Sequence, residues 1–241
     1  MRRLIFLLAL PLSLPLLGQD ATAAFFKGDP KAVLTVCADR ARALDPKDSR
    51  LLAEYGRAYL LAGDRAKAEV TFKAAALSDP KDAETYRLIA MAWFSAGQKP
   101  EALAALQTMQ TMDPKAKNVF KHAAINLLDA GCVEEAQTLM ERAWTLDPKD
   151  YNNGKDFAFA ALRTQHWEVA SAWIERIHVL EPKEWEDPIA FARAALRGGK
   201  RDLAGLWLER AVLARPKEVR MWNEIALLFA EQENPAWTAH P

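Results

Sequence analysis

The stretch of sequence that decides the fold is residues 49–82, which read SRLLAEYGRAYLLAGDRAKAEVTFKAAALSDPKD. Apolar and small residues recur at helical spacing on both sides of Gly63, and a glycine there suits the left-handed turn that ends a helix. Asp64 can cap the helix that follows, and Pro80 ends that helix because it disfavours the helical region for Asp79. The stretch therefore predicts two helices joined by a tight turn.

The Pro-Lys pair near the end of this stretch recurs along the chain at a constant interval of 34 residues. The six prolines are Pro46, Pro80, Pro114, Pro148, Pro182 and Pro216, and a lysine follows each of them. A fixed period of this length is typical of stacked supersecondary units that bury their apolar faces only against their neighbours. The sequence predicts an all-α solenoid of helix-turn-helix repeats with this period.

The residues within each period resemble the tetratricopeptide repeat, which places a large residue, Leu-Gly, Tyr, Gly, Ala, Phe, Ala and Pro at fixed offsets. In residues 83–116 the matching positions are Tyr86, Ile89, Ala90, Trp93, Gly97, Ala102, Leu106 and Pro114. In later periods Gly154 and Pro188 replace the first large residue, and Gln165 stands where the turn glycine is expected. The resemblance implies a right-handed superhelical solenoid of about six repeats plus a C-terminal capping helix, which we expect over residues 24–233.

Both ends of the repeat array depart from the pattern. Gly28 lies one residue further from its Pro-Lys pair than the other turn glycines do, which indicates a one-residue insertion in that turn. Trp222 and Phe229 belong to the first helix of a seventh repeat that lacks its second helix, so we expect this helix to cap the last apolar face. Residues 234–241 are polar and bounded by prolines, and we expect a flexible tail there.

The first 23 residues are typical of a secretory signal peptide. Two arginines precede an apolar stretch from Leu4 to Leu17, and the small residues Ala21-Thr22-Ala23 follow it. The apolar stretch is shorter than the roughly 18 to 20 residues that span a bilayer, although a retained anchor is the alternative. We expect cleavage after Ala23, export to a bacterial periplasm, and no integral membrane span in the mature chain.

Composition and motifs argue against several function classes. Lys plus Arg and Asp plus Glu both total 32, so no positive net charge points to nucleic acid as a partner. No zinc-binding, phosphate-loop or nucleophile motif occurs, and we expect no metal, no cofactor and no catalytic residue. Cys37 and Cys132 lie too far apart in a solenoid to form a disulfide, and we expect both to act as small apolar residues. The oligomeric state stays open.

Tryptophans are frequent in the fifth repeat, where the repeat pattern is weakest. Trp167, Trp173 and Trp185 lie within it or at its exit. Packing between helices and an exposed aromatic contact patch are both compatible with this clustering, since aromatic side chains anchor cores and interfaces alike.

In the family that the sequence resembles, the first helix of each repeat lines the concave face, and five of its positions look inward. In repeats 2 to 6 these positions hold eight basic residues and only three acidic ones. The basic residues are Arg50, Arg57, Arg87, Lys121, Lys155, Arg163, Arg193 and Arg197, and the acidic ones are Glu84, Asp129 and Glu186. A basic stripe on this face is one interpretation, and an ordinary solvated helix face is the other.

We expect a partner-binding site that combines most of these cations with the apolar side chains between them. Its residues are Arg57, Arg87, Met91, Phe94, Lys121, Ile125, Lys155, Phe159, Arg163, Arg193 and Arg197. Such a surface suits a protein or peptide segment that is acidic and partly apolar. The resemblance implies a non-catalytic protein–protein interaction scaffold. The alternative is a structural component of a cell-envelope assembly or secretion complex, held by its convex face or its ends.

Overall fold

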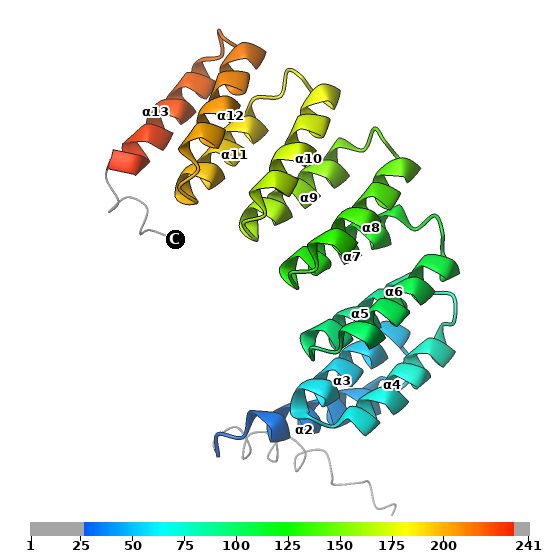
Figure 1. Ribbon diagram of the computed structural model, residues 1–241. Coiled ribbons are helices and arrows are strands. Elements are labelled where there is room, and N and C mark those ends of the chain that lie inside the picture. The colour runs from blue at the N-terminus through cyan, green and yellow to red at the C-terminus, as the bar shows by residue number, and fades with distance from the viewer. Residues whose placement is uncertain (1–26, 234–241) are drawn as a thin grey trace, which may run out of the picture. The chain divides into compact units, whose positions relative to one another are not determined.

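The computed structural model describes residues 27–233, and these residues form twelve α-helices and no strand (Figure 1). The predicted all-α class is therefore confirmed. The expected signal peptide, residues 1–23, and the expected tail, residues 234–241, lie outside the described residues. None of the described helices is both long enough and apolar enough to cross a membrane.

The chain divides into two compact units, with the boundary between Val119 and Phe120. The helices of the first unit are α2 (Pro30–Leu44), α3 (Ser49–Ala62), α4 (Arg65–Ser78), α5 (Ala83–Ser95) and α6 (Lys99–Met112). The second unit contains nearly all of α7 (Lys117–Asp129), then α8 (Val133–Leu146), α9 (Tyr151–Arg163), α10 (Trp167–Leu180), α11 (Glu186–Arg197), α12 (Arg201–Ala214) and α13 (Val219–Glu233). The continuous, right-handed superhelix expected over residues 24–233 stays a prediction.

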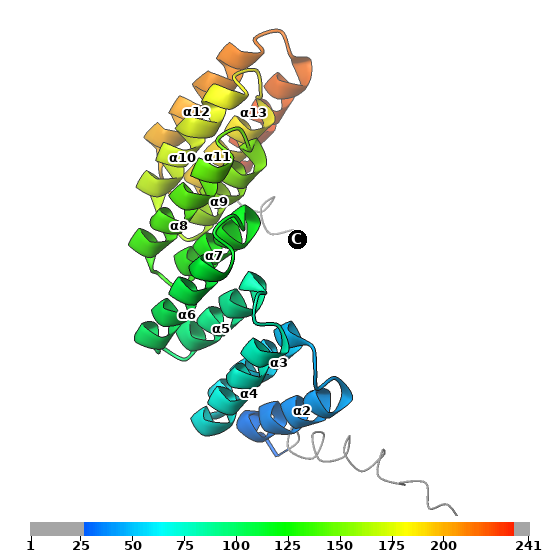
Figure 2. The same cartoon turned by 90° about the vertical axis from the view of Figure 1, so that its right-hand side faces the viewer.

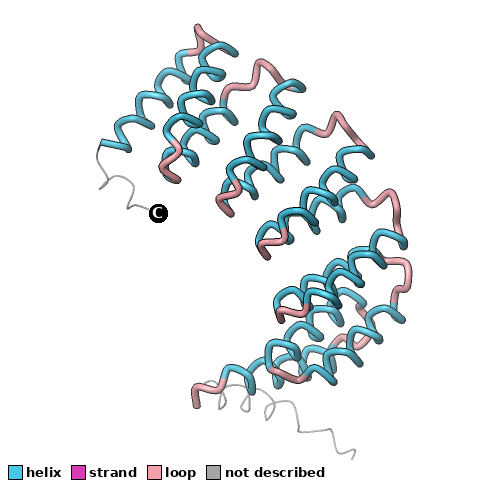
Figure 3. Tube along the Cα trace, in the orientation of Figure 1, coloured by secondary structure: helices cyan, strands magenta, loops and turns pink. Residues whose placement is uncertain are grey.

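Each unit is built from helix-turn-helix repeats in two layers. In the second unit α7, α9, α11 and α13 form one layer and α8, α10 and α12 the other (Figure 2). In the first unit α3 packs on its partner α4 and on α5, the first helix of the next repeat. Short loops join the helices at their two opposite ends, as Figure 3 shows.

An aspartate precedes four of the six Pro-Lys pairs, and its side chain helps to close the repeat by satisfying backbone donors. Asp79 ends α4, and its side chain accepts a hydrogen bond from the backbone N–H of Lys81 at 3.3 Å. Asp113 does the same for the N–H of Lys115 at 3.0 Å. Proline has no N–H and stops the helix, so the aspartate and the proline together fix the exit of the chain toward the next repeat.

The one-residue insertion near Gly28 lies in a helix and not, as the sequence suggested, in the turn. The other second helices, α4, α6, α8, α10 and α12, each contain 14 residues, whereas α2 contains 15. The additional residue is at its N-terminus, where Pro30 occupies the first turn and Asp29 caps the N–H of Ala32. A proline is well tolerated there because the first N–H groups of a helix have no partner within it.

Within a repeat the two helices approach closely because small residues lie opposite large ones. Gly56 lies between Leu52 and Tyr59 on α3, and a Cβ atom added to it would be only 2.3 Å from the ring of Phe72 on α4. Gly154 shows how an atypical repeat compensates, because the space over it is filled by side chains from α8 and α10. The replacement of the first large residue of the repeat by Gly154 therefore leaves no cavity at this point.

The turns between the helices of a repeat require a left-handed backbone. Gly97, Gly131 and Gly199 have φ angles of 72° to 73°. Gln165 has a φ of 63° at the corresponding turn, and among the described residues it is the only non-glycine with a positive φ. The fold thus keeps its turn geometry at this position although the residue does not favour it.

We expect Gln165→Gly to raise the free energy of unfolding by about 1 kcal/mol, because a left-handed backbone costs a residue with a Cβ about that much. The matched control is Gly131→Gln, which should lower the stability of the same unit by a similar amount. Urea denaturation of the two variants and the original chain measures both changes. An unchanged or lower stability of Gln165→Gly would show that the side chain of Gln165 makes contacts worth as much as the backbone cost.

Candidate functional site

The predicted site residues lie on the first helices of their repeats in both units. In the first unit Arg57 lies on α3, and α5 carries Arg87, Met91 and Phe94. In the second unit α7 carries Lys121 and Ile125, α9 carries Lys155, Phe159 and Arg163, and α11 carries Arg193 and Arg197. The partner helices of the repeats contribute none of them.

Four of these residues are brought together in one pocket of about 380 Å³ between α9 and α11. They are Phe159, Arg163, Arg193 and Arg197. The sequence-based list did not include the other lining residues, which are Leu162, Gln165, Trp167, Ala190, Ala194 and Gly198. We take this pocket as the candidate site and call it the α9–α11 pocket.

The apolar part of the α9–α11 pocket is built by aromatic rings. The ring of Phe159 packs on that of Phe191, with centroids 4.4 Å apart. The indole of Trp167 lies directly over Gly198, where an added Cβ would be 2.3 Å from two of its ring atoms. The sequence contains a signal for this contact, because Gly198 precedes the turn glycine Gly199 where repeats 2 to 5 have Ala or Thr. A glycine that the turn does not need indicates a close approach.

The three arginines of the pocket differ in their partners. Arg163 pairs with Asp129 at 2.7 Å, and both side chains are exposed. Arg193 donates to Glu224 at 3.1 Å, but its buried Nε has no hydrogen-bond acceptor among the described residues, the nearest carboxylate oxygen being that of Glu231 at 3.8 Å. Within residues 27–233 the exposed guanidinium of Arg197 has no ion-pair partner.

The other predicted cations are paired with carboxylates. Arg87 forms two hydrogen bonds with Glu84, at 2.8 and 2.6 Å. The remaining pairs are Arg57–Glu54 at 3.7 Å, Lys121–Asp156 at 2.8 Å and Lys155–Asp187 at 3.2 Å. Most of these carboxylates lie at positions that the sequence-based count of inward residues did not include. The excess of positive charge counted along the first helices is therefore largely neutralised. Of the predicted site cations, Arg197 is the one that has no carboxylate partner among the described residues.

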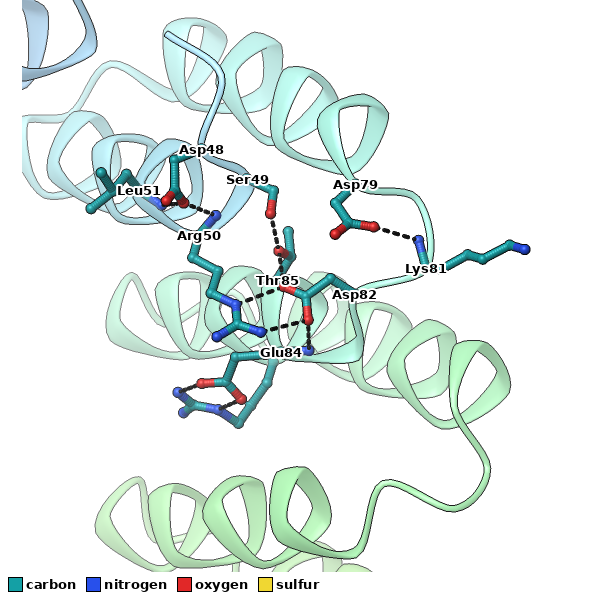
Figure 4. A network of polar contacts seen from close by, with 10 residues as sticks. Asp48, Ser49, Arg50, Leu51, Asp79, Lys81, Asp82, Glu84 and Thr85 are labelled. Atoms are coloured by element: carbon teal, nitrogen blue, oxygen red, sulfur yellow. Dashed lines mark hydrogen bonds and ion pairs between the residues drawn. The ribbon is translucent and has the colours of Figure 1, made fainter. Parts of the chain in front are cut away.

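One of these charged networks joins two repeats of the first unit (Figure 4). Arg50 on α3 donates two hydrogen bonds to Asp82 at the start of α5, at 2.8 and 3.0 Å. Thr85 also donates to Asp82, and the hydroxyls of Thr85 and Ser49 lie 2.9 Å apart in the buried part of the network. The hydrogen bonds from Arg50 lower the pKa of Asp82, although partial burial of the carboxyl acts in the opposite direction.

The tertiary packing also decides between the two interpretations of the tryptophans. Trp173 is 2% exposed and Trp185 is 9% exposed, so both belong to the core. Trp173 makes edge-on contacts with Trp144 and Phe157, each with centroids 5.3 Å apart. Only Trp167 of the three is partly exposed, and it lines the α9–α11 pocket. An exposed patch of all three tryptophans is therefore wrong.

One of the two cysteines differs from what the sequence suggested. Cys37 and Cys132 lie in different units and form no disulfide with each other, as expected. Cys37 on α2 is exposed, so it is not a small apolar residue of the core. Cys132 is partly buried at the start of α8, immediately after the turn glycine.

The α9–α11 pocket presents hydrogen-bond donors and apolar surface. Its lining residues supply guanidinium donors, one amide and apolar surface, and include no histidine, carboxylate, hydroxyl or thiol. Within the described part of the chain, no group of three or more His, Cys, Asp or Glu side chains is arranged to hold a metal ion. Arginines beside aromatic rings can bind a carboxylate and an adjacent apolar group together.

The Arg50–Asp82 network leads to a prediction about pH. A carboxyl whose pKa is lowered by folding stabilises the folded state above its unfolded pKa, near 4, and this contribution is lost as the pH falls through the lower folded value. The stability difference between the original chain and Asp82→Asn should therefore be largest at neutral pH and shrink below about pH 4. Urea denaturation over a pH series measures the difference.

The matched control for this experiment is Asp48→Asn. Asp48 caps α3 at the position equivalent to Asp82, and its side chain accepts from the backbone N–H groups of Arg50 and Leu51. Asparagine also caps helices well, so neither substitution removes a cap. Equal pH dependence of the two variants would show that the link to Arg50 does not stabilise the fold.

Comparisons with known proteins place the first repeats in a family. Residues 27–92 match the family model described as tetratricopeptide repeat. No curated protein sequence matches the chain.

Solved structures with low similarity include the following three proteins. A crystal structure of MamA is 16% identical, with 83% of this chain and 96% of that chain covered and a TM-score of 0.35. The protein YrrB, described as a TPR protein with an unusual peptide-binding site, is 13% identical, with 77% and 96% covered and a TM-score of 0.39. The PilF protein of Pseudomonas aeruginosa is 14% identical, with 88% and 96% covered and a TM-score of 0.39. With TM-scores below 0.5, these three carry no argument about this chain.

Proposed function

Because this chain belongs to the tetratricopeptide repeat family, we propose that it is a non-catalytic protein–protein interaction scaffold. In the proposal an extended segment of a partner protein binds to the first helices of the repeats, on the side that is expected to be concave. The observation that carries the proposal is the α9–α11 pocket, in which an arginine without a described ion-pair partner lies beside aromatic rings. The partner segment is acidic and partly apolar.

Arg197 is the charge anchor of this proposal. A carboxylate that enters the α9–α11 pocket can pair with Arg197 without displacing a described partner, whereas Arg163 and Arg193 already bind Asp129 and Glu224. The buried Nε of Arg193 offers a further donor that no described group accepts from. An unsatisfied buried donor costs free energy, so a ligand oxygen that accepts from it would be favoured.

Apolar contacts supply the rest of the affinity. An apolar side chain next to the carboxylate can rest on Phe159 and Trp167, between the small residues Ala190 and Ala194. Aromatic side chains held by packing bury area with little loss of conformational entropy. Phe159 is held by Phe191, and Trp167 by its close contact with Gly198.

The remaining predicted residues extend the proposed surface along the first helices of each unit. Lys121, Ile125 and Lys155 belong to the same layer of the second unit as the pocket, and the first unit offers Arg57, Arg87, Met91 and Phe94. Because their cations are paired, they add apolar contact and register more than net attraction. The attraction for an acidic segment is therefore concentrated at the α9–α11 pocket.

The second candidate function is a structural part of a cell-envelope assembly or secretion complex. The observation in its favour lies on the second helices. Leu77, Val179 and Leu213 occupy the same position of their repeats, and they are 79%, 76% and 72% exposed. Exposed aliphatic residues at a repeated position suit a contact made by this face, although each unit presents only one or two of them.

The scaffold proposal predicts the behaviour of a defined probe, a dye-labelled extended peptide that alternates Asp or Glu with Leu or Phe. The original chain should bind it, and the same peptide with Asn and Gln should bind at least about tenfold more weakly. Arg197→Glu should slow association by about tenfold and remove most of its salt dependence, because it reverses the steering charge. Phe159→Ala should chiefly speed dissociation. Stopped-flow fluorescence separates the two rates.

The matched control for the charge reversal is Arg201→Glu, at an exposed arginine on α12 that does not line the pocket. It changes the net charge of the chain by the same amount, so it should leave the association rate nearly unchanged. Equal binding by Arg197→Glu, Phe159→Ala and the original chain would favour a solvated face over a binding site.

We also propose that the protein is exported to a bacterial periplasm, on the basis of the signal-like residues 1–23. N-terminal sequencing of the protein from its native compartment should then begin at Ala24, followed by Phe25 and Phe26. Recovery of the uncleaved chain in membranes alone would show instead that the segment is an anchor.

A further inference from the structure

The last helix of the second unit carries an exposed apolar stripe. The equivalent stripes of the other described repeats are covered. α13 packs on α11 and α12, at the end of the unit (Figure 1). Trp222, Ala226 and Phe229 are exposed on it, Trp222 by 48% and Phe229 by 53%. In repeats 2 to 6 the residues at these three positions are buried or, at Tyr86, partly buried. The second helix of the same repeat covers them there, and residues 27–233 contain no second helix after α13.

The exposed stripe is uncharged and fixed in place. Trp222, Ala226 and Phe229 follow one another at helical spacing, and the exposed residues Val219 and Asn223 lie beside them. The indole Nε1 of Trp222 donates to the carbonyl oxygen of Pro216 at 2.9 Å, which holds the ring against the start of α13. Capping helices of repeat arrays normally turn a polar face to water. The stripe on α13 does not.

The fourth repeat shows what covers an equivalent stripe. Phe120, Ala124 and Leu127 on α7 have the same large-small-large order, and all three are fully buried. The second helix of that repeat, α8, presents the complementary order, with Ala136, Met140 and Ala143 also buried. Its Arg142 lies 4.7 Å from the ring centre of Phe120, which places α8 over this stripe. Small residues receive the large ones of the facing helix, as close packing requires.

We propose that the stripe of Trp222, Ala226 and Phe229 is a docking site for an amphipathic helix of another protein. The docked helix takes the place that the second helix occupies in a complete repeat, and its apolar face has the small-large-small order with no charge in the stripe. This site lies on a different surface from the α9–α11 pocket and does not depend on the function proposed for that pocket. It gives the chain a second binding mode, for a helix instead of an extended segment.

A second copy of the chain fits the stripe poorly. Antiparallel pairing of two α13 helices about Ala226 would place Trp222 of each against Phe229 of the other, with alanine facing alanine between them. The two large aromatic side chains would then clash at both ends of the pairing, and a gap would remain between the alanines in the middle. The large-small-large order is complementary to the second helices of the repeats and not to itself.

The probe for this proposal is a dye-labelled peptide with the sequence of α8, Val133–Leu146. Fluorescence anisotropy should show saturable binding to the original full-length chain. Ala226→Arg, which places a long cation in the middle of the stripe, should weaken binding at least about tenfold. Phe229→Ala should weaken it as well, and it keeps the helix intact. The matched control is Ala172→Arg at an exposed alanine on α10, which should leave binding unchanged.

Four outcomes would overturn the proposal. They are the absence of saturable peptide binding, equal binding by Ala226→Arg and Ala172→Arg, a dimer of the original chain that Ala226→Arg dissociates, and binding that appears only in a chain ending at Glu233. The third would assign the stripe to a second copy, and the fourth to residues 234–241. Size-exclusion chromatography with light scattering distinguishes the dimer from the monomer.

Discussion

The close crossing of two helices at a glycine or alanine is the constraint on which the rest of each unit depends. At Gly56 the ring of Phe72 occupies the space that a Cβ would need, and at Gly154 the same is true of Ile177 and Trp144. This approach sets the distance between the two layers, and it therefore sets which side chains of neighbouring repeats can touch. A large residue at either crossing would push the helices apart and change every contact between the layers.

The ion pairs between neighbouring repeats depend on this spacing. When repeats stack at a fixed distance, a cation on one repeat meets a carboxylate on the next. The pairs that join neighbouring repeats in this manner include Arg50–Asp82, Lys121–Asp156, Arg163–Asp129 and Arg210–Glu175. Each exposed ion pair contributes little to stability, about 0–1 kcal/mol. Each pair also neutralises a charge that would otherwise attract a partner protein. Specific attraction therefore remains only where the series of pairs is interrupted, as at Arg197.

The repeat architecture also explains why the two proposed binding modes lie where they do. An internal repeat has its apolar stripes covered by its own helices, so it offers a ligand its outer surface, as in the α9–α11 pocket. A terminal repeat has one stripe that its neighbours do not reach, and on α13 this stripe is apolar. An extended segment suits the first kind of surface, and a helix suits the second.

The sequence by itself determined the helices, their turns and their period, because these depend on local chemistry. Pro-Lys pairs, turn glycines and small residues at fixed offsets act on their immediate neighbours, so spacing alone indicated an insertion near Gly28 and an atypical turn at Gln165. The structure placed the insertion within α2 and showed that the backbone of Gln165 is left-handed. Only the tertiary structure decided which cations lack a partner, which tryptophans are buried, and that Trp167 and Gly198 complete a pocket with four of the predicted residues. The physical reason is that an ion pair or a ring contact joins atoms about a full repeat apart in the chain, and whether they meet depends on the packing distance and side-chain direction that stacking alone fixes.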